Sequence, residues 1–165
     1  GDEEILRLEK LPDCEKAAGV EPSALRRMAA LLPAAPEIAG KVAARLKLSR
    51  EQRRYLKCCA ARTAADNDAP RALAYRVGKE CARDRLLLLD NGPSPILGWD
   101  VPQLPLKGGE IVERGVAAGP EVARILQTVE NRWVEEGFPD RARVEQLLGE
   151  ELPAGQFRNG DAFRH

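Results

Sequence analysis

Apolar residues recur at steps of three and four along most of this chain, which is the spacing of one face of an α-helix. The segment from Pro22 to Leu32 shows the pattern, and Pro33 ends it because proline lacks the backbone N–H that a helix needs. Aromatic residues make up only 4% of the chain, and the β-branched residues that favour strands are sparse. The sequence therefore predicts an all-α fold of about six to eight helices. The expected helices cover residues 22–32, about 38–46, 49–65, 70–90, 109–114, 120–136 and a last segment after Asp140.

Several of these helices carry local start signals. Ser49, with Gln52 three residues later, forms a capping box. Asp68 is expected to cap the helix that has Pro70 in its first turn, and Asp140 to cap the last helix. Four-residue steps mark the second helix at Ile38, Val42 and Leu46. The residues expected on the buried sides of later helices are Leu56, Cys59, Ala60 and Thr63; Leu73, Val77, Cys81 and Leu88; and Val122, Ile125, Leu126, Val129 and Trp133.

Composition divides the chain into four parts. Residues 1–91 are expected to form a helical body, 92–107 a connection with four prolines, 108–152 a helical tail, and 153–165 a frayed end with little periodicity. Apolar runs such as Leu86 to Leu89 are far short of the roughly 18–20 residues of a membrane-spanning helix. No secretory signal is visible at the start of the sequence. These features predict a cytoplasmic protein without a membrane partner.

Residue types that commonly carry catalysis or bind metals are few. The only histidine is His165, so the commonest general base is missing from the interior of the sequence. Asp66 and Asp68 could share a divalent metal, but no strand or glycine loop adjoins them, which favours a cap and a turn. The spacing of the cysteines fits neither a zinc site nor a disulfide framework, so we expect buried, reduced thiols. The four cysteines are Cys14, Cys58, Cys59 and Cys81.

Charges cancel over the whole chain but not along it. The sequence has 26 basic and 26 acidic residues. Residues 1–40 hold 5 basic and 8 acidic residues, 41–85 hold 13 and 5, and 86–165 hold 8 and 13. A neutral chain with a concentrated basic centre can still present a positive face to an anionic partner.

The basic centre contains a cationic ridge, defined here as Arg50, Arg53, Arg54 and Lys57. On a helix that begins after Ser49, this spacing puts all four on one face, opposite Leu56 and Cys59. Backbone phosphates are natural partners of such a face, because a guanidinium group can donate two hydrogen bonds at once. A solvated face is an equally open interpretation. With Tyr55 as its only aromatic residue, the ridge favours shape recognition over base stacking. Other basic residues nearby are Lys41, Arg45, Lys47 and Arg62.

A glycine-flanked loop, residues 115–119, precedes the helix that starts at Pro120. Free backbone amides at a helix N-terminus can hold a phosphate, and Gly119 would allow a close approach. The same loop can also be purely architectural, with Gly115 ending one helix and Pro120 starting the next. Architecture is the favoured interpretation, which leaves the amides after Gly119 as weaker candidates for phosphate binding.

The segment from Trp99 to Phe138 has a more specific pattern. It reads WDVPQLPLKGGEIVERGVAAGPEVARILQTVENRWVEEGF and resembles the C-terminal region of the bacterial CCA-adding tRNA nucleotidyltransferase and poly(A) polymerase family. LRRMAALLP from Leu25 and VAARLKLSREQRRYL from Val42 are similar to the preceding body helices of that family. The resemblance covers about residues 25–148. The sequence departs from the family pattern where Glu110 replaces a usual Asp and Ala123 a frequent Gly.

The resemblance implies an all-α body and tail that lacks the family's catalytic head. That head carries a glycine-rich turn, a paired-aspartate site for Mg²⁺, and motifs that select CTP and ATP. None of these occurs in this sequence, so we expect no catalytic residue, metal ligand or cofactor in this chain. The implied role is to hold tRNA, or another RNA 3′ region, over a head supplied by the N-terminal part of a longer protein. The residues expected to bind RNA phosphates are Lys47, Arg50, Arg53, Arg54, Lys57 and Gly119.

Two other classes of function remain open at the level of sequence. A stand-alone helical module could dock another protein through its acidic C-terminal part, with the ridge serving solubility. A self-contained enzyme is disfavoured, because the sequence offers no histidine base, convincing nucleophile or metal site. The resemblance does not distinguish a CCA-adding from a poly(A)-adding parent protein.

Overall fold

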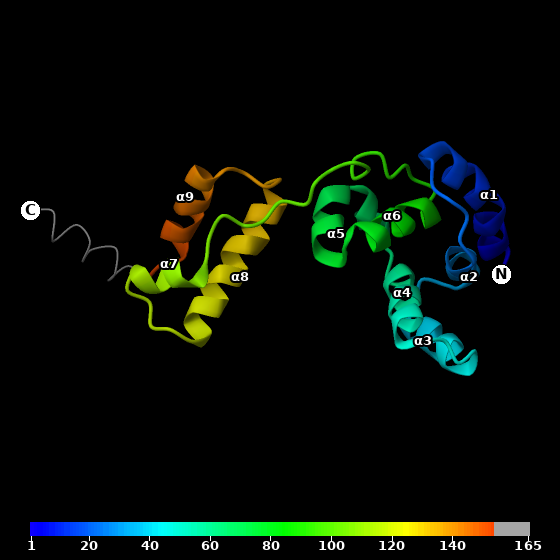
Figure 1. Ribbon diagram of the computed structural model, residues 1–165, viewed down its shortest axis with the longest axis horizontal. Coiled ribbons are helices and arrows are strands. Elements are labelled where there is room, and N and C mark those ends of the chain that lie inside the picture. Colours follow the sequence, from blue (N-terminus) through cyan, green and yellow to red (C-terminus); the bar gives the residue numbers. More distant parts are fainter. Residues whose placement is uncertain (154–165) are drawn as a thin grey trace, which may run out of the picture. The chain divides into compact units, whose positions relative to one another are not determined.

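The computed structural model describes residues 1–153, and these residues form helices without a β-strand (Figure 1). The prediction of an all-α fold is confirmed. The chain divides into two compact units, residues 1–101 and a second unit that starts at Pro102. The helices are α1 (Asp2–Ala18), α2 (Ala24–Leu31), α3 (Pro36–Arg45), α4 (Arg50–Ala60), the short 3₁₀ helix η1 (Ala64–Asn67), α5 (Pro70–Val77), α6 (Lys79–Leu88), α7 (Gly108–Glu113), α8 (Pro120–Glu135) and α9 (Arg141–Glu151).

The first unit is built from consecutive helix pairs. α1 packs against α2, α3 against α4, and α5 against α6, while α6 also contacts α1, α2 and α4. Helices α4 and α6 therefore lie at the centre of the unit. Its main core consists of small and aliphatic side chains, which suits close helix packing: Leu11, Ala29, Ala30, Ala39, Ala43, Leu56, Cys59, Ala60, Leu87 and Leu88.

Helices α3 and α4 form a tight hairpin. Ala39 and Ala43 on α3 are fully buried, whereas Ile38 and Leu46 are 43% and 53% exposed. The apolar spacing that marks this helix in the sequence is therefore not its buried face, because the alanine face allows closer contact with α4. Lys47 adopts a left-handed conformation (φ 54°) in the turn, and the predicted capping box between Ser49 and Gln52 starts α4.

The prediction of a single helix over residues 70–90 is wrong. This segment is divided at Gly78, whose φ of 92° is in the left-handed region that glycine adopts without strain. α4 also ends earlier than expected, at Ala60, and Thr63 beyond it is exposed. Asp68 does not cap α5, because the N-cap is Ala69. The division at Gly78 places Cys81 in the first turn of α6 rather than in the middle of a long helix.

The proline-rich segment 92–107 is shared between the two units. Ile96 is buried in the first unit against Leu73 and Leu86, and Trp99 packs against the same cluster. The guanidinium of Arg71 lies 5.5 Å from the centre of the Trp99 ring. Leu106 is buried and lies within the second unit. The segment therefore packs into the units, because it carries apolar side chains between its prolines.

The second unit contains α7, α8 and α9. Pro120 occupies the first position of α8, and the Asp140 side chain accepts a hydrogen bond from the Arg143 amide, as the sequence predicts. Ile125, Val129 and Trp133 are buried along α8, facing a core that also includes Val144, Leu147 and Leu148 of α9. The buried face predicted for the long helix is confirmed at these three positions, while Val122 and Leu126 are half-buried.

The frayed end predicted for residues 153–165 lies, beyond Pro153, outside the described residues. Among the helices of residues 1–153, none has both the length and the apolar character to cross a membrane.

Candidate nucleic-acid interface

The cationic ridge lies on one face of α4. Arg50, Arg53, Arg54 and Lys57 are all exposed, while Leu56, Cys59 and Ala60 on the opposite side are buried in the core. The capping box at Ser49 fixes where the helix starts, and so fixes the register that aligns these four side chains. The ridge is thus presented by a helix whose other face is anchored.

Within the described residues, none of the four ridge side chains has an acidic partner. The arginines described in the second unit behave differently, since five of them pair with glutamates. Arg124 pairs with Glu121 on the same helix, and Arg143 pairs with Glu136 at 2.7 Å. The other three are Arg114, Arg132 and Arg141. The positive charge of the ridge is therefore available to an external anion.

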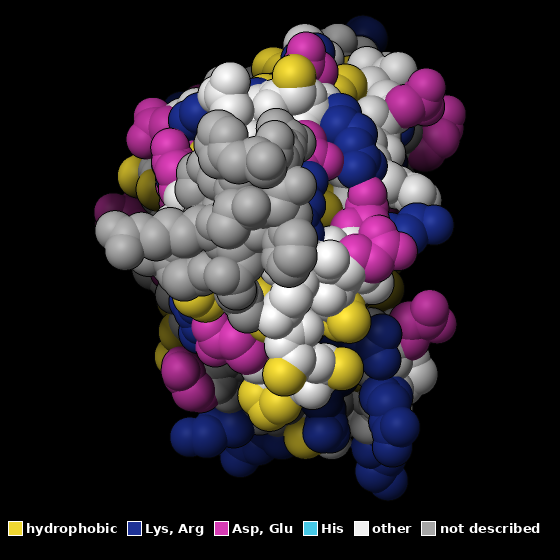
Figure 2. All heavy atoms as spheres, turned by 90° about the vertical axis from the view of Figure 1, so that its left-hand side faces the viewer, with side chains coloured by type: hydrophobic (Ala, Val, Ile, Leu, Met, Phe, Trp, Pro, Cys, Tyr) yellow, Lys and Arg dark blue, Asp and Glu magenta, His cyan; other side chains and the backbone are white. Residues whose placement is uncertain are grey.

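Additional lysines and arginines extend this surface across the α3–α4 hairpin. Lys41, Arg45 and Lys47 are exposed on α3 and in the turn after it. The stem of Lys57 crosses α3 at Gly40, where an added Cβ would lie 3.6 Å from its Cδ atom. In the space-filling view, Lys and Arg side chains gather along the lower edge (Figure 2).

Two residues near the ridge in sequence do not belong to this surface. Arg62 is buried, and it donates hydrogen bonds to the carbonyl oxygens of Cys59 (3.1 Å) and Leu32 (2.9 Å). Burial, together with a smaller effect of the Arg7 charge, lowers the pKa of Arg62 to about 10. Tyr55 is half-buried and donates to Asp84 at 2.5 Å, so its ring is held away from the ridge.

Gly119 belongs to the second unit, so it is not part of the hairpin surface. It precedes α8 with a φ of 132° and no side-chain cap. The first turn of α8 contains Glu121, whose carboxylate would repel a phosphate at this helix end. Phosphate binding after Gly119 stays a prediction.

Asp66 acts as a cap, in line with the favoured sequence interpretation. Its carboxylate accepts a hydrogen bond from the Thr63 amide at 3.0 Å, and lies 3.6 Å from Arg85. Asp68 ends the 3₁₀ helix η1. In residues 1–153, no three His, Cys, Asp or Glu side chains are grouped as a metal site would require.

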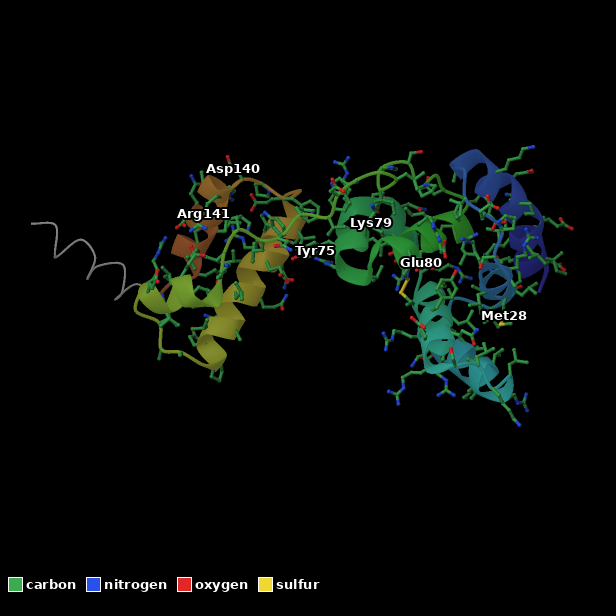
Figure 3. All side chains as sticks on the ribbon, in the orientation of Figure 1. Met28, Tyr75, Lys79, Glu80, Asp140 and Arg141 are labelled. Atoms are coloured by element: carbon green, nitrogen blue, oxygen red, sulfur yellow. A yellow bond between two sulfur atoms is a disulfide. The ribbon has the colours of Figure 1, made fainter. Side chains whose placement is uncertain are left out.

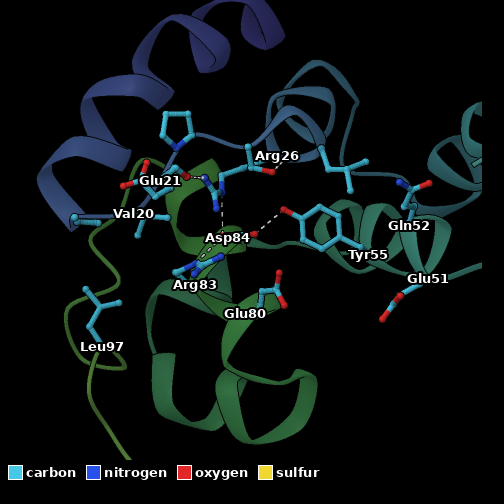
Figure 4. Close-up of a pocket in the computed structure, with 15 residues that line it drawn as sticks. Val20, Glu21, Arg26, Glu51, Gln52, Tyr55, Glu80, Arg83, Asp84 and Leu97 are labelled. Atoms are coloured by element: carbon cyan, nitrogen blue, oxygen red, sulfur yellow. Dashed lines mark hydrogen bonds and ion pairs between the residues drawn. The ribbon is translucent and has the colours of Figure 1, made fainter. Parts of the chain in front are cut away.

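Sequence reasoning missed a buried ionic network, defined here as Glu15, Arg26 and Asp84. Figure 4 shows two of its members, Arg26 and Asp84. Arg26 pairs with Glu15, and its Nε donates to Asp84 at 2.9 Å. Arg83 also pairs with Asp84 at 2.9 Å. The sequence contains one indication of this network. Arg26 lies three and four residues before the buried Ala29 and Ala30, so it shares their face of the helix.

Two residues of the network, Arg26 and Asp84, form the floor of a pocket of about 720 Å³. Its rim includes the exposed carboxylates of Glu21, Glu51 and Glu80 together with the apolar side chains of Val20 and Leu97. The charges on the floor are paired with each other, so none is free for chemistry. The pocket therefore supports no assignment of an active site.

Burial also perturbs two groups beside the network. It raises the pKa of Tyr55 above the ordinary range, with further contributions from Cys59 and Asp84, so Tyr55 stays protonated as a donor. It raises the pKa of the Cys59 thiol to about 11. Both groups are therefore neutral near pH 7.

The thiol of Cys59 should make stability depend on alkaline pH. Because the folded pKa is about 11 and the ordinary value is 9.0, the unfolded chain loses this proton first. The stabilising effect is complete below pH 9 and is lost as the pH rises through 11, for a total of about 2–3 kcal/mol. Urea unfolding from pH 8 to 11 should show a steeper loss in the wild type than in Cys59→Ala. Equal slopes would contradict the raised pKa.

In comparisons with known proteins, no protein-family model, curated protein or solved structure matches this chain.

Proposed function

We propose that this chain binds RNA through backbone phosphates, with the cationic ridge and Lys47 as the contact surface and tRNA or another RNA 3′ region as the partner. The observation that carries the proposal is the set of ridge cations without acidic partners. A helix face that serves only solubility commonly carries ion pairs between residues three or four positions apart. Arg124 and Glu121 on α8 form such a pair. The ridge has one acidic neighbour, Glu51, which lies in the first turn of α4.

The geometry favours recognition of shape over sequence. Three guanidinium groups at three- and four-residue spacing can each donate two hydrogen bonds to phosphate oxygens. No aromatic ring accompanies them, because Tyr55 is hydrogen-bonded to Asp84 beneath the surface. Phosphate contacts position a protein on RNA but carry no base sequence. The surface is therefore suited to a folded RNA whose backbone bends around a narrow helical hairpin.

The resemblance to CCA-adding and poly(A)-adding enzymes supplies the biological setting of the proposal. In that setting the chain is a cytoplasmic RNA-holding part of a nucleotidyltransferase. Nucleotide addition would belong to a separate head that binds Mg²⁺ with CTP or ATP. The residues of this chain would hold the RNA and would take no part in the chemical step.

Reversing the charge of the ridge tests the proposal. In the triple variant R50E/R53E/R54E, affinity for a labelled tRNA should fall about 30- to 100-fold near 0.1 M salt, because about three phosphate contacts are lost. The slope of log affinity against log salt should flatten by about 2–3, since each contact contributes roughly 0.7–0.9. A titration of the whole chain across a salt series measures both quantities.

A second triple variant controls for net charge. Lys16, Arg76 and Lys79 are exposed cations of the same unit on α1, α5 and α6, so K16E/R76E/K79E changes the charge equally away from α4. This variant should retain affinity within about threefold. Equal losses of affinity in both variants would mean that net charge alone explains the effect. Unchanged binding in the ridge variant, or no tRNA binding by the wild type at low salt, would overturn the proposal and favour a protein-docking module.

A further inference from the structure

A disulfide bond joins Cys58 on α4 to Cys81 on α6, and it appears as the yellow bond between these helices in Figure 3. The expectation that all four cysteines are reduced is therefore wrong for this pair, while Cys14 and Cys59 are free thiols. Sequence spacing gave no sign of the pairing, because α4 and α6 are brought together only by tertiary packing. The bond lies next to the end of α4 that follows the ridge.

Cys58 is the more accessible of the two cysteines. The residue is half-buried, whereas Cys81 is 8% exposed. The guanidinium of Arg85 lies beside Cys58, with Nη2 3.7 Å from the sulfur and Nε donating to the Cys58 carbonyl at 2.7 Å. Asp66 contacts the other side of this guanidinium at 3.6 Å and holds it in place. A thiolate formed at Cys58 would therefore face a fixed positive charge.

Cys81 has a different source of thiolate stabilisation. It is the third residue of α6, which starts directly after the break at Gly78. Backbone amides and the helix dipole at this end favour negative charge, and such positions lower thiol pKa values in proteins. Reduction of the bond would thus release two sulfurs that are both stabilised as thiolates. A disulfide whose thiols leave as stable anions exchanges readily.

The remaining cysteines are unsuited to this chemistry. Burial raises the pKa of Cys59 to about 11, and burial together with the Asp90 carboxylate raises that of Cys14. Both therefore stay protonated near pH 7, and a protonated thiol does not attack a disulfide. Although Cys59 is next to Cys58 in the sequence, its thiol does not compete for the bond between Cys58 and Cys81. Exchange with an external thiol is the reaction that remains.

We propose that Cys58–Cys81 is a site of reversible thiol–disulfide exchange with a low-molecular-weight thiol of the glutathione class, attacked at the Cys58 sulfur. A glutathione thiolate forms a bond to the Cys58 sulfur, and the bond to Cys81 breaks with its electron pair leaving on Cys81. A second glutathione thiolate then attacks the glutathione sulfur of the mixed disulfide and releases Cys58 as a thiolate. The sum converts two glutathione thiols into oxidised glutathione and leaves two cysteine thiols in the protein.

Glutathione itself is the probe for the test. The wild-type chain is equilibrated with reduced and oxidised glutathione at several ratios, quenched by acid, alkylated and mapped by mass spectrometry. The pair should pass from disulfide to dithiol as reduced glutathione rises to about 10 mM, and the intermediate adduct should map to Cys58. A bond that stays intact at that concentration is a structural disulfide and overturns the proposal, as does an adduct on Cys81 or Cys59.

Two matched variants locate the reacting sulfur. C81S keeps Cys58 beside Arg85 and should take up one glutathione from oxidised glutathione, whereas C58S leaves the buried Cys81 and should react at least tenfold more slowly. In the reduced protein, R85Q should slow alkylation of Cys58 at least threefold at pH 7 relative to the wild-type sequence, because the positive charge beside the thiolate is lost. Circular dichroism checks that the variants fold. If they do not, the adduct position in the wild type decides, and equal rates in folded variants overturn the proposal.

Discussion

Replacing Arg26 with alanine is expected to lower the free energy of unfolding of the first unit by about 3–5 kcal/mol. Arg26 is 2% exposed, and it is the cation shared by the carboxylates of Glu15 and Asp84, which are 2% and 1% exposed. Its removal would leave these two carboxylates buried without their central partner. Taking a charge out of water without pairing it costs several kcal/mol. Urea denaturation followed by circular dichroism measures the change.

Arg27 provides the matched control. It pairs with the same Glu15 at 3.3 Å, but its side chain is 40% exposed. Solvent screening leaves such a pair worth about 0–1 kcal/mol, so Arg27→Ala should have little effect. Similar losses in the two variants would show that burial does not set the strength of this network. Replacing Glu15, Arg26 and Asp84 together by apolar residues of similar size should cost less than Arg26→Ala, because no fully buried charge is left unpaired. The arginines that lose a partner, Arg27 and Arg83, both reach solvent.

Local chemistry explains which parts of the fold the sequence could predict. The capping box at Ser49, the proline at position 120 and the cap at Asp140 act through neighbouring residues, and all three occur in the structure as expected. The apolar stripe of α8 is equally local, because one helix face supplies it. The ridge residues share an exposed face for the same reason, since the start of α4 fixes their register.

Features that depend on tertiary contacts could not be predicted in this way. Helix α1 (Asp2–Ala18) has Pro12 inside it and Glu15 at a buried position, so its apolar pattern is interrupted. Glu15 is tolerated there only because α2 brings Arg26 against it. The disulfide likewise depends on α6 lying beside α4.

Replacing Trp133 with alanine is expected to destabilise the second unit by about 3–5 kcal/mol, the usual range for removing a buried aromatic side chain. Trp133 is 2% exposed and meets Phe138 edge to face at a centroid distance of 4.9 Å. Its indole N–H donates to the Pro139 carbonyl at 2.9 Å, which holds the turn between α8 and α9. The substitution would therefore leave a cavity and also free the turn that joins the two helices.

The chain contains its own reporter for this experiment. It has two tryptophans, so in Trp133→Ala the fluorescence comes from Trp99, which packs in the first unit. Because each unit has its own core, helical circular dichroism should show an early transition that Trp99 fluorescence does not follow. Val112→Ala is the control, since this α7 side chain is 41% exposed and should change stability by less than about 0.5 kcal/mol. A single coincident transition in Trp133→Ala would mean that the two cores unfold as one cooperative unit.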